Sequence, residues 1–400
     1  MKVLFVQDTY FYKGNNNQYY SEHIDNCILN RYLHLGDKVT FLGREENQKK
    51  HQDLKKRFSP LDKSKCSVVG VPNFKTLKGY FKYKKKVQEK VENTVKEHDI
   101  IMPRIPSALG ALAVKYAIKH NKALIGEIVG CTWDGYWNYN LKGKLVASYY
   151  YFKQRKIVKK LPYAVYVTQH FLQKRYPTRG KHINASNVVI QNVDHSILEK
   201  RLHKILNKKE DEVVVFATIA GLDVPFKGQK YVLQAMAKSK IKNSVYKVVG
   251  NGSGNLLKEN AKSLNLVNKF EVIGAIKHNE IFDFLDDIDL YIQPSKQEGL
   301  PRALIEAMSR GLPSIGSRTG GIPELLDREF IFNKGDSREL AKIIDKYDKD
   351  KMFREAKRNF NKAQEYSIAN LNNKRYRFYY EFLRANDLPI PDKLNKVIHQ

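Results

Sequence analysis

Cysteine is scarce in this chain of 400 residues, which contains only Cys27, Cys66 and Cys131. Their wide spacing excludes a disulfide framework and a paired metal-ligand motif, and it favours a reducing compartment such as the cytoplasm. The eleven histidines show no ligand spacing either. We therefore expect no bound metal.

Long apolar runs are also missing. No stretch approaches the roughly 20 consecutive apolar residues that a helix needs to span a bilayer. The opening Met1–Val6 resembles a signal sequence only until Gln7 and Asp8 interrupt it, so we interpret it as a buried strand. The sequence predicts that nothing crosses a membrane.

Acidic residues are outnumbered, with 42 Asp and Glu against 71 Lys and Arg, and the net charge is +29. Residues 1–200 hold 36 basic and 16 acidic residues, a net charge of +20, so the excess lies mainly in the first half. Such a field suits nucleic acid, an anionic bilayer surface or phosphorylated substrates. Zinc-finger spacing and RRM-like aromatic motifs are absent, which argues against a nucleic-acid partner.

Two stretches concentrate this charge, 74–90 and 144–160, and both mix lysines with aromatic residues. As helices they would carry a cationic face with aromatic flanks, a pattern typical of helices that bind an anionic membrane surface. The alternative is a solvated basic face whose aromatic residues belong to the core.

Short β-rich apolar runs alternate with helical periods throughout, which predicts an α/β fold with parallel sheets. The alternation pauses near residue 190 and restarts at Val213. We therefore expect two doubly wound domains, 1–200 and 201–370, and a helical tail, 371–400, that can pack back on the first domain. Open α/β sheets bind ligands beyond the carboxyl ends of their strands, so the cleft between the domains is the expected site.

The segment 295–326 is the most informative, because it has the pattern strand, loop, helix, strand, loop, helix. Pro301 can begin a helix whose free amides and dipole would bind a phosphate. Glu298 lies just before this helix and Glu306 lies within it. Carboxylates at these places can accept hydrogen bonds from the hydroxyls of a nucleotide-sugar. Alternatively, Glu306 merely pairs with Arg302 one helical turn away.

This segment resembles the signature of the family-4 retaining glycosyltransferases, which have the two-domain GT-B fold. The resemblance covers the Glu298 and Glu306 motif, 311–313 and the Gly-Gly-Ile-Pro-Glu stretch at 320–324. It implies that Glu298 contacts the donor sugar and that Glu306 holds the nucleotide ribose. The diphosphate would be held by backbone amides of the loop, at Gly299, Leu300 and Arg302.

Other features extend the resemblance over most of the second half. Lys227 matches a diphosphate-binding lysine, although the arginine common about five residues earlier is Leu222 here; Arg302 is the cation that could replace it. Gly252 belongs to a matching glycine-rich turn, 250–254, and residues 191–194 resemble the family's domain crossover. The expected nucleobase contacts are Gly274, Ala275 and Ile276.

Asp287 and Asp289 spell the Asp-x-Asp motif that binds a metal–nucleotide in the other large glycosyltransferase fold. Here the pair lies between a predicted helix and a predicted strand, where family-4 sequences carry a structural aspartate. We therefore expect no metal at this place.

In the first half, the resemblance to bacterial capsule and O-antigen glycosyltransferases is looser. Gly14 follows the first strand, while Arg104, Glu127 and Asp134 come at or just beyond strand ends. A sugar acceptor is bound by this domain in enzymes of the GT-B fold, so these four are the expected acceptor-binding residues. Each can also be ordinary loop or core structure.

Together these features predict a retaining glycosyltransferase with Glu298, Lys227 and Arg302 as the residues most important for catalysis. It would move a sugar from a nucleotide-sugar to a hydroxyl of a glycan or polyprenyl-diphosphate-linked acceptor, without a cofactor or metal. The expected role is surface polysaccharide biosynthesis at the inner face of the cell membrane, where the basic first domain would contact anionic lipid. The alternatives are an epimerase of the same fold and a basic nucleic-acid-binding protein.

Overall fold

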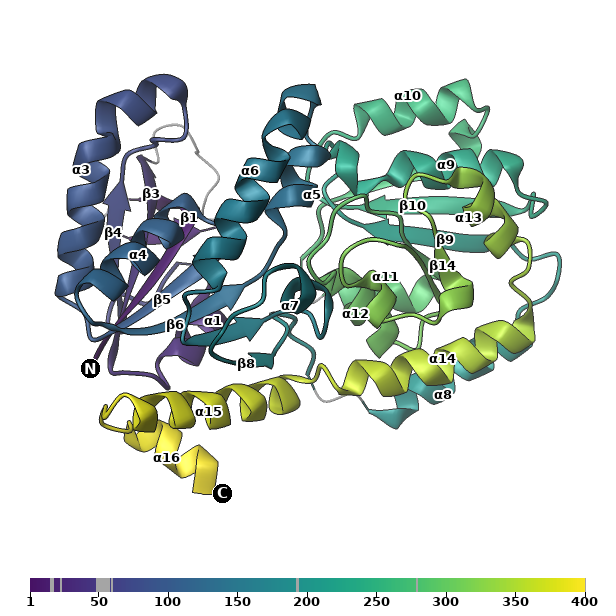
Figure 1. Cartoon of the computed structure of the whole chain (residues 1–400). Coiled ribbons are helices and arrows are strands. Elements are labelled where there is room, and N and C mark those ends of the chain that lie inside the picture. Colours follow the sequence, from purple (N-terminus) through teal and green to yellow (C-terminus); the bar gives the residue numbers. More distant parts are fainter. Residues whose placement is uncertain are drawn as a thin grey trace.

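Two parallel β-sheets, each flanked by helices, form the two halves of the molecule (Figure 1). The computed structural model describes residues 1–399 except 15–17, 22–23, 48–57, 59, 192–193 and 278–279. The carboxyl ends of the strands in the two sheets face each other, because loops that follow strands in one sheet contact loops that follow strands in the other.

The first sheet has the strand order β4-β3-β1-β5-β6-β7-β8, and only β2, paired with β1, is antiparallel. All six residues of β5 are buried, as expected for a strand that is covered on both faces. The strands are β1 Lys2–Lys13, β2 Tyr19–Ser21, β3 Lys38–Asn47, β4 Cys66–Val71, β5 Ile100–Ile105, β6 Ala123–Ile128, β7 Tyr163–Tyr166 and β8 Lys181–Asn184.

Three helices of the first domain begin in the same way. The side-chain oxygens of Thr76, Ser107 and Asn140 each accept a hydrogen bond from the N–H of the glycine three residues later, which satisfies an otherwise free donor of the first turn. The helices of this domain are α1 Asn26–Tyr32, α3 Leu77–Lys96, α4 Ala108–Lys119, α5 Thr132–Trp137, α6 Leu141–Val158 and α7 Phe171–Arg175.

The second sheet has the order β11-β10-β9-β12-β13-β14, and all its strands are parallel. The strands are β9 Val214–Ile219, β10 Ser244–Val249, β11 Phe270–Gly274, β12 Leu290–Gln293, β13 Ser314–Ser317 and β14 Ile331–Phe332. The helices are α8 His195–Asn207, α9 Gln229–Lys238, α10 Asn255–Ser263, α11 Glu280–Asp287, α12 Arg302–Ser309, α13 Ser337–Ile344 and α14 Lys349–Gln364, with 3₁₀ turns η3 Pro225–Lys227, η4 Val267–Lys269, η5 Ile322–Glu324 and η6 Arg328–Phe330.

The second domain begins with α8, a few residues before the predicted boundary at 201. The guanidinium of Arg201 is buried and donates to the carbonyls of Leu285, Ile288 and Arg310. Because α8 also packs against α14, it belongs to the second domain. The motif at 191–194 lies at this crossover, but its central residues are outside the described part of the chain.

The chain returns to the first domain after α14. Helices α15 Ile368–Ala385 and α16 Asp392–His399 lie below the first domain in Figure 1. The rings of Tyr376 and His34 stack with their centroids 4.0 Å apart, and Phe382 packs edge-on against Tyr163. The last helices therefore complete the core of the first domain rather than extend the second.

Candidate active site

The loops that follow β9, β10, β11 and β12 lie at the same edge of the second sheet, since the carboxyl ends of parallel strands lie at one edge. The N–H of Lys296 donates to the carbonyl of Phe226 at 2.7 Å and joins the loops after β12 and β9. Gly250 N–H donates to Gly274 at 2.9 Å and joins the loops after β10 and β11. These contacts bring the predicted donor-binding segments together.

Lys227 and Glu298 form the central ion pair of this edge. The Nζ of Lys227 lies 2.6 Å from Oε1 of Glu298, and the two side chains are 25% and 10% exposed. Ser295 donates its hydroxyl to the same Oε1 at 2.7 Å, and Gln293 donates its amide to it at 3.3 Å. The other oxygen, Oε2, accepts no hydrogen bond from the described residues, so one side of this anchored carboxylate is available to a ligand.

Two glycines allow the loops to approach so closely. Gly228, after Lys227, has a φ of 79°, and a Cβ there would collide with the carbonyl of Pro294. Gly320 has a φ of 57°, and a Cβ there would collide with the carbonyl of Glu298. Both have left-handed backbone conformations that favour glycine, and both lie directly against the segment that carries Glu298.

The N-terminus of α12 provides free donors beside this pair. Its cap residue is Pro301, which supplies no side-chain hydrogen bond. Among the described residues, the amides of Gly299, Leu300 and Arg302 find no acceptor. Together with the helix dipole they suit an anionic group, as predicted for a diphosphate.

The side chains of Glu306 and Arg302, both on α12, have different surroundings. Glu306 is 6% exposed, whereas Arg302 is exposed and forms no ion pair with any described residue. The alternative that Glu306 serves only as the helical partner of Arg302 is therefore not what the structure shows. Arg302 is free to move toward a bound anion.

The glycine-rich turn 250–254 is partly occupied by the chain itself. The carboxylate of Asp223 accepts the N–H groups of Ser253 at 2.8 Å and Gly254 at 2.9 Å, and these amides lower its pKa. The Cα of Gly252 lies against the same carboxylate. This turn therefore does not offer a free set of amides for phosphate, and the prediction for Gly252 needs a contact other than those two amides.

The predicted nucleobase loop lies next to this turn. Gly274 has a φ of 85° and open space around it, and Ala275 after it is exposed. Ile276 is half-buried. The backbone of this loop is thus accessible, as a contact with a flat base would need.

Asp289 is a structural brace. Its carboxylate accepts the N–H of Val215 at 2.8 Å and lies 2.6 Å from the Nζ of Lys208, so it ties β12 to β9. Within the described ranges, no group of three or more His, Cys, Asp or Glu side chains is placed to hold a metal ion.

In the first domain, Arg104 and Glu127 bind each other instead of facing an acceptor. Their side chains are 7% and 2% exposed, and the Nη2 of Arg104 lies 2.8 Å from Oε2 of Glu127. Tyr32 donates its hydroxyl to the other oxygen of Glu127 at 2.8 Å. Burial alone would raise the pKa of Glu127, but the Arg104 guanidinium lowers it. Both oxygens of Glu127 are thus occupied within the core, and this geometry does not support the expected acceptor role of the pair.

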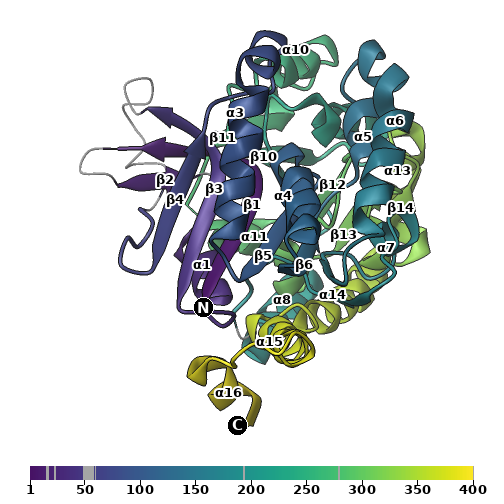
Figure 2. The same ribbon diagram turned by 60° about the vertical axis from the view of Figure 1, so that its left-hand side comes forward.

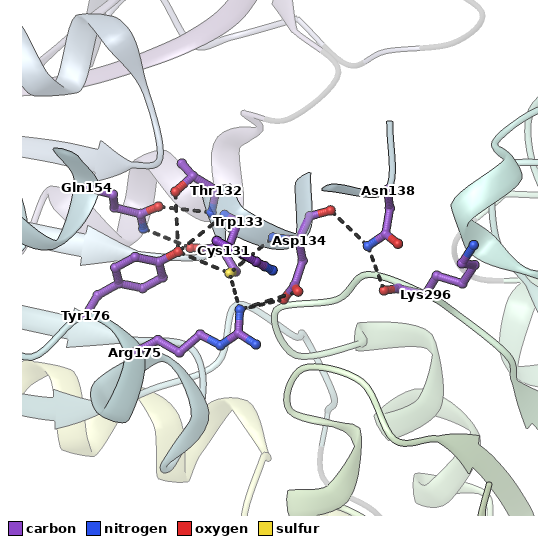
Figure 3. A network of polar contacts seen from close by, with 10 residues as sticks. Cys131, Thr132, Trp133, Asp134, Asn138, Gln154, Arg175, Tyr176 and Lys296 are labelled. Carbon is purple, nitrogen blue, oxygen red and sulfur yellow. Dashed lines mark hydrogen bonds and ion pairs between the residues drawn. The ribbon is translucent and has the colours of Figure 1, made fainter. Parts of the chain in front are cut away.

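Asp134 takes part in a buried network at the start of α5 (Figure 3). It is 4% exposed and lies 3.4 Å from Nη1 of Arg175, which also donates to the thiol of Cys131 at 3.1 Å. Directly after this helix, Asn138 donates to the carbonyl of Lys296 at 3.0 Å, in the loop that carries Glu298. Asp134 therefore holds a helix that touches the donor loop and is not itself free for an acceptor.

Gly14 closes the hairpin between β1 and β2, where its N–H donates to the carbonyl of Gln18 at 2.7 Å. Gly14 follows the first strand as expected, since β1 ends at Lys13, and its acceptor-binding role stays a prediction. The adjoining asparagines of the predicted loop, 15–17, lie outside the described residues.

Glu324 is a contact between the domains to which the sequence assigned no role. Its carboxylate accepts the N–H groups of Gln169 at 2.6 Å, His170 at 3.0 Å and Phe171 at 2.6 Å. These donors lie at the start of α7, whose cap residue His170 makes no side-chain hydrogen bond of its own. In the sequence, only the position of Glu324 in the Gly-Gly-Ile-Pro-Glu motif indicated that this residue could have a role.

Comparison with known proteins follows the same division of the chain. Residues 199–365, which are nearly the whole second domain, match the family described as glycosyl transferases group 1. Protein CapJ of Staphylococcus aureus is 29% identical over 99% of this chain and 100% of its own length. The UDP-Gal:alpha-D-GlcNAc-diphosphoundecaprenol alpha-1,3-galactosyltransferase of Escherichia coli is 35% identical, over 32% of this chain and 33% of its own.

Solved structures resemble the whole fold. Anabaena Alr3699/HepE in complex with UDP has a TM-score of 0.65 at 18% identity, and covers 96% of this chain and 100% of its own. Sucrose-phosphate synthase of Thermosynechococcus elongatus has a TM-score of 0.65 at 14% identity, with the same coverage. The predicted GT-B arrangement of two Rossmann-like domains is confirmed.

Proposed function

We propose that this chain, whose second domain matches the family described as glycosyl transferases group 1, is a family-4 glycosyltransferase that transfers a sugar with retention of its anomeric configuration. The donor is a nucleotide-sugar, and the acceptor is a hydroxyl of a glycan or of a polyprenyl-diphosphate-linked sugar. The similarity to CapJ and to a galactosyltransferase with a diphosphoundecaprenol-linked acceptor in its name supports a role in surface polysaccharide synthesis.

The observation that carries this proposal is the Lys227–Glu298 pair beside the uncapped start of α12. A donor diphosphate placed there would accept hydrogen bonds from the amides of Gly299 and Leu300 and attract the Lys227 ammonium away from Glu298. The carboxylate, still held by Ser295, would then be free to accept hydroxyl groups of the sugar.

In the proposed reaction, the bond between the anomeric carbon and the diphosphate breaks while the acceptor hydroxyl attacks from the same face. The leaving diphosphate takes the hydroxyl proton, and Lys227, Arg302 and the amides of α12 stabilise its negative charge. This route needs no protein nucleophile and no metal. The contacts across the domains, from Asn138 and Glu324, would keep the two substrates together and water out.

A thermal-shift screen against UDP-, GDP-, ADP- and TDP-linked sugars tests the donor, since a ligand that binds only the folded state raises the melting temperature. We expect one nucleotide class to raise it in the wild-type protein and to have little effect on Lys227→Ala. Release of nucleoside diphosphate only when an acceptor glycan is added would establish transfer. Conversion of the donor sugar without an acceptor would instead indicate an epimerase.

The proposal places the enzyme at the inner face of the cell membrane, where polyprenyl-linked acceptors are accessible from the cytoplasm. Among the described residues, no helix is both long and apolar enough to span a bilayer. Contact with the membrane would therefore depend on the protein surface, and the basic first domain is the obvious candidate.

A further inference from the structure

Helix α6 exposes a continuous row of large apolar side chains, which we call the α6 stripe. It consists of Leu141, Leu145, Tyr149 and Phe152, which are 78%, 84%, 62% and 65% exposed. Their spacing of three or four residues puts them on one side of the helix. Both ribbon views place α6 at the surface of the first domain, beside α5 (Figure 1, Figure 2).

The stripe is not needed to attach α6 to the domain. The opposite side of the helix does this, because Ala147, Gln154 and Val158 are buried there. Gln154 donates to the carbonyl of Gly130 at 3.0 Å and accepts the N–H of Thr132 at 3.1 Å. A surface helix normally buries one apolar face and exposes polar residues, whereas α6 is apolar on both faces.

The exposure is also concentrated at this place. Of the fifteen large hydrophobic side chains that are exposed among the described residues, seven lie between Trp137 and Phe152. Isolated exposed apolar residues are ordinary, but a contiguous group on one helix marks an interaction surface. The α6 stripe therefore needs an occupant.

The charge around the stripe identifies this occupant. Lys142, Lys144, Lys153 and Lys156 are exposed beside it, and the chain has no Asp or Glu between Asp134 and Asp194. Lysine stems can cover apolar surface while their ammonium groups reach outward, so lysines flanking an apolar row match the boundary between acyl chains and anionic headgroups. The sequence predicted a basic helix with aromatic flanks at 144–160. The structure shows that this helix also exposes a row of apolar side chains.

We propose that the α6 stripe docks the protein on an anionic lipid bilayer, with the four apolar side chains in the interface and the lysines at the headgroups. The acceptor part of this inference rests on the proposed function, whereas the docking itself does not. Helix α6 is joined to α5 by the stacked rings of Tyr136 and Tyr150, 4.2 Å apart, and Asn138 after α5 contacts the donor loop. Docking through α6 would therefore hold the active site close to a lipid-linked acceptor.

The test compares two double variants in sedimentation with phosphatidylcholine vesicles that contain or lack phosphatidylglycerol. Leu145→Gln with Phe152→Gln removes half of the stripe. The matched control, Leu256→Gln with Val267→Gln, changes two side chains of the second domain that are 60% and 59% exposed. Circular dichroism and the melting temperature show that each variant is folded.

We expect the wild-type protein and the control to bind vesicles that contain phosphatidylglycerol. The stripe variant should bind them on the order of 100-fold more weakly, about tenfold for each lost side chain. Replacing the four lysines with Gln should weaken binding about fivefold per lysine and reduce its dependence on salt. Arg155 is left unchanged, since it donates to the carbonyl of Arg175 at 2.9 Å.

Equal vesicle binding by the stripe variant and the wild type, or none by the wild type, would overturn the inference. So would a wild-type dimer in analytical ultracentrifugation that the stripe variant dissociates, because the stripe would then join two copies. Nucleotide-sugar binding and transfer to a water-soluble acceptor should be unchanged in the stripe variant. If the stripe variant loses vesicle binding but keeps transfer, the docking inference is supported. If the wild-type protein binds vesicles but shows no transfer, the proposed function fails while the docking inference stands.

Discussion

The two domains each contain a carboxylate–cation pair at the carboxyl end of the sheet, and the two pairs have opposite surroundings. In the first domain, both oxygens of Glu127 are occupied, by Arg104 and Tyr32, and the pair is buried. In the second domain, Glu298 receives all its donors on one oxygen and lies beside free amides. The difference teaches that residue type and strand position alone do not distinguish a carboxylate enclosed in the core from one with an oxygen still available to a ligand.

The largest expected effect is on the open pair. Glu298→Gln and Lys227→Ala should each reduce transfer about 1,000-fold, because each loses charge stabilisation in the reaction, and neither should lower the melting temperature substantially. Lys230→Ala, an exposed lysine on α9, is the control and should keep full turnover. Near-normal turnover in both variants, with the fold intact, would mean that the two pairs do not differ in function.

The closed pair should show the reverse. Glu127→Gln should lower the free energy of unfolding by about 3–5 kcal/mol, because it leaves the Arg104 guanidinium buried without its partner. Transfer per folded molecule should change only a few-fold. Urea unfolding and active-site titration measure the two quantities.

The double variant Arg104→Met with Glu127→Leu sharpens this test. It removes both charges and should recover much of the stability lost by Glu127→Gln. If Glu127→Gln instead abolishes transfer in a stable protein, Glu127 acts on a substrate and the comparison fails.

A third carboxylate, that of Glu355, is buried and forms no ion pair with the described residues. Glu355 on α14 accepts the N–H of Ser314 at 3.1 Å and the hydroxyl of Tyr347 at 2.9 Å, but its Oε1 is buried without a partner among the described residues. Burial raises the pKa of Glu355 to about 7. The neutral form of Glu355 should therefore stabilise the fold, whereas for Glu127 the ionised form does so.

Because the folded protein binds the Glu355 proton more tightly than the unfolded chain, this residue stabilises the fold below its unfolded pKa. That contribution should be lost as the pH rises from about 4.5 to about 7, at a cost on the order of 3 kcal/mol. Urea unfolding at several pH values should show this decline in the wild type and not in Glu355→Gln. Parallel curves for the two proteins would contradict the raised pKa.

The smallest effect is expected at the contact between the domains. Glu324→Gln keeps an acceptor but removes the charge that holds three N–H groups of the first domain. Charge-assisted bonds are about twice as strong as neutral ones, so we expect about a tenfold rise in the donor KM and a smaller change in kcat. Glu329→Gln, which changes an exposed glutamate nearby, is the control. An equal rise in the donor KM of this control would contradict the role given to Glu324.

The sequence predicted the second domain more accurately than the first. The sequence predicts a strand at 290–292 and helices at 280–287 and 301–310. β12, α11 and α12 lie within a residue or two of these bounds, since they combine buried runs with clear end signals such as Pro301 and Gly311. The strands β2, β4, β8 and β14 were missed. β2, β8 and β14 are short, and β4 and β8 are the two edge strands of the first sheet.

The candidate site divides in the same way. The sequence assigned both Lys227 and Glu298 to the donor site, and their ion pair is consistent with loops that meet at one edge of a parallel sheet. The saturation of Glu127 depends on Tyr32, and the filling of the glycine-rich turn depends on Asp223. Such partners are set by tertiary packing, and no local pattern in the sequence indicates them.

The central claim is that the open pair and the start of α12 bind the donor diphosphate. A crystal structure with a nucleoside diphosphate tests it most directly. We predict phosphate oxygens within hydrogen-bond distance of Lys227 Nζ and of the amides of Gly299 and Leu300. A diphosphate bound away from this loop, with Lys227 still paired to Glu298, would contradict the account.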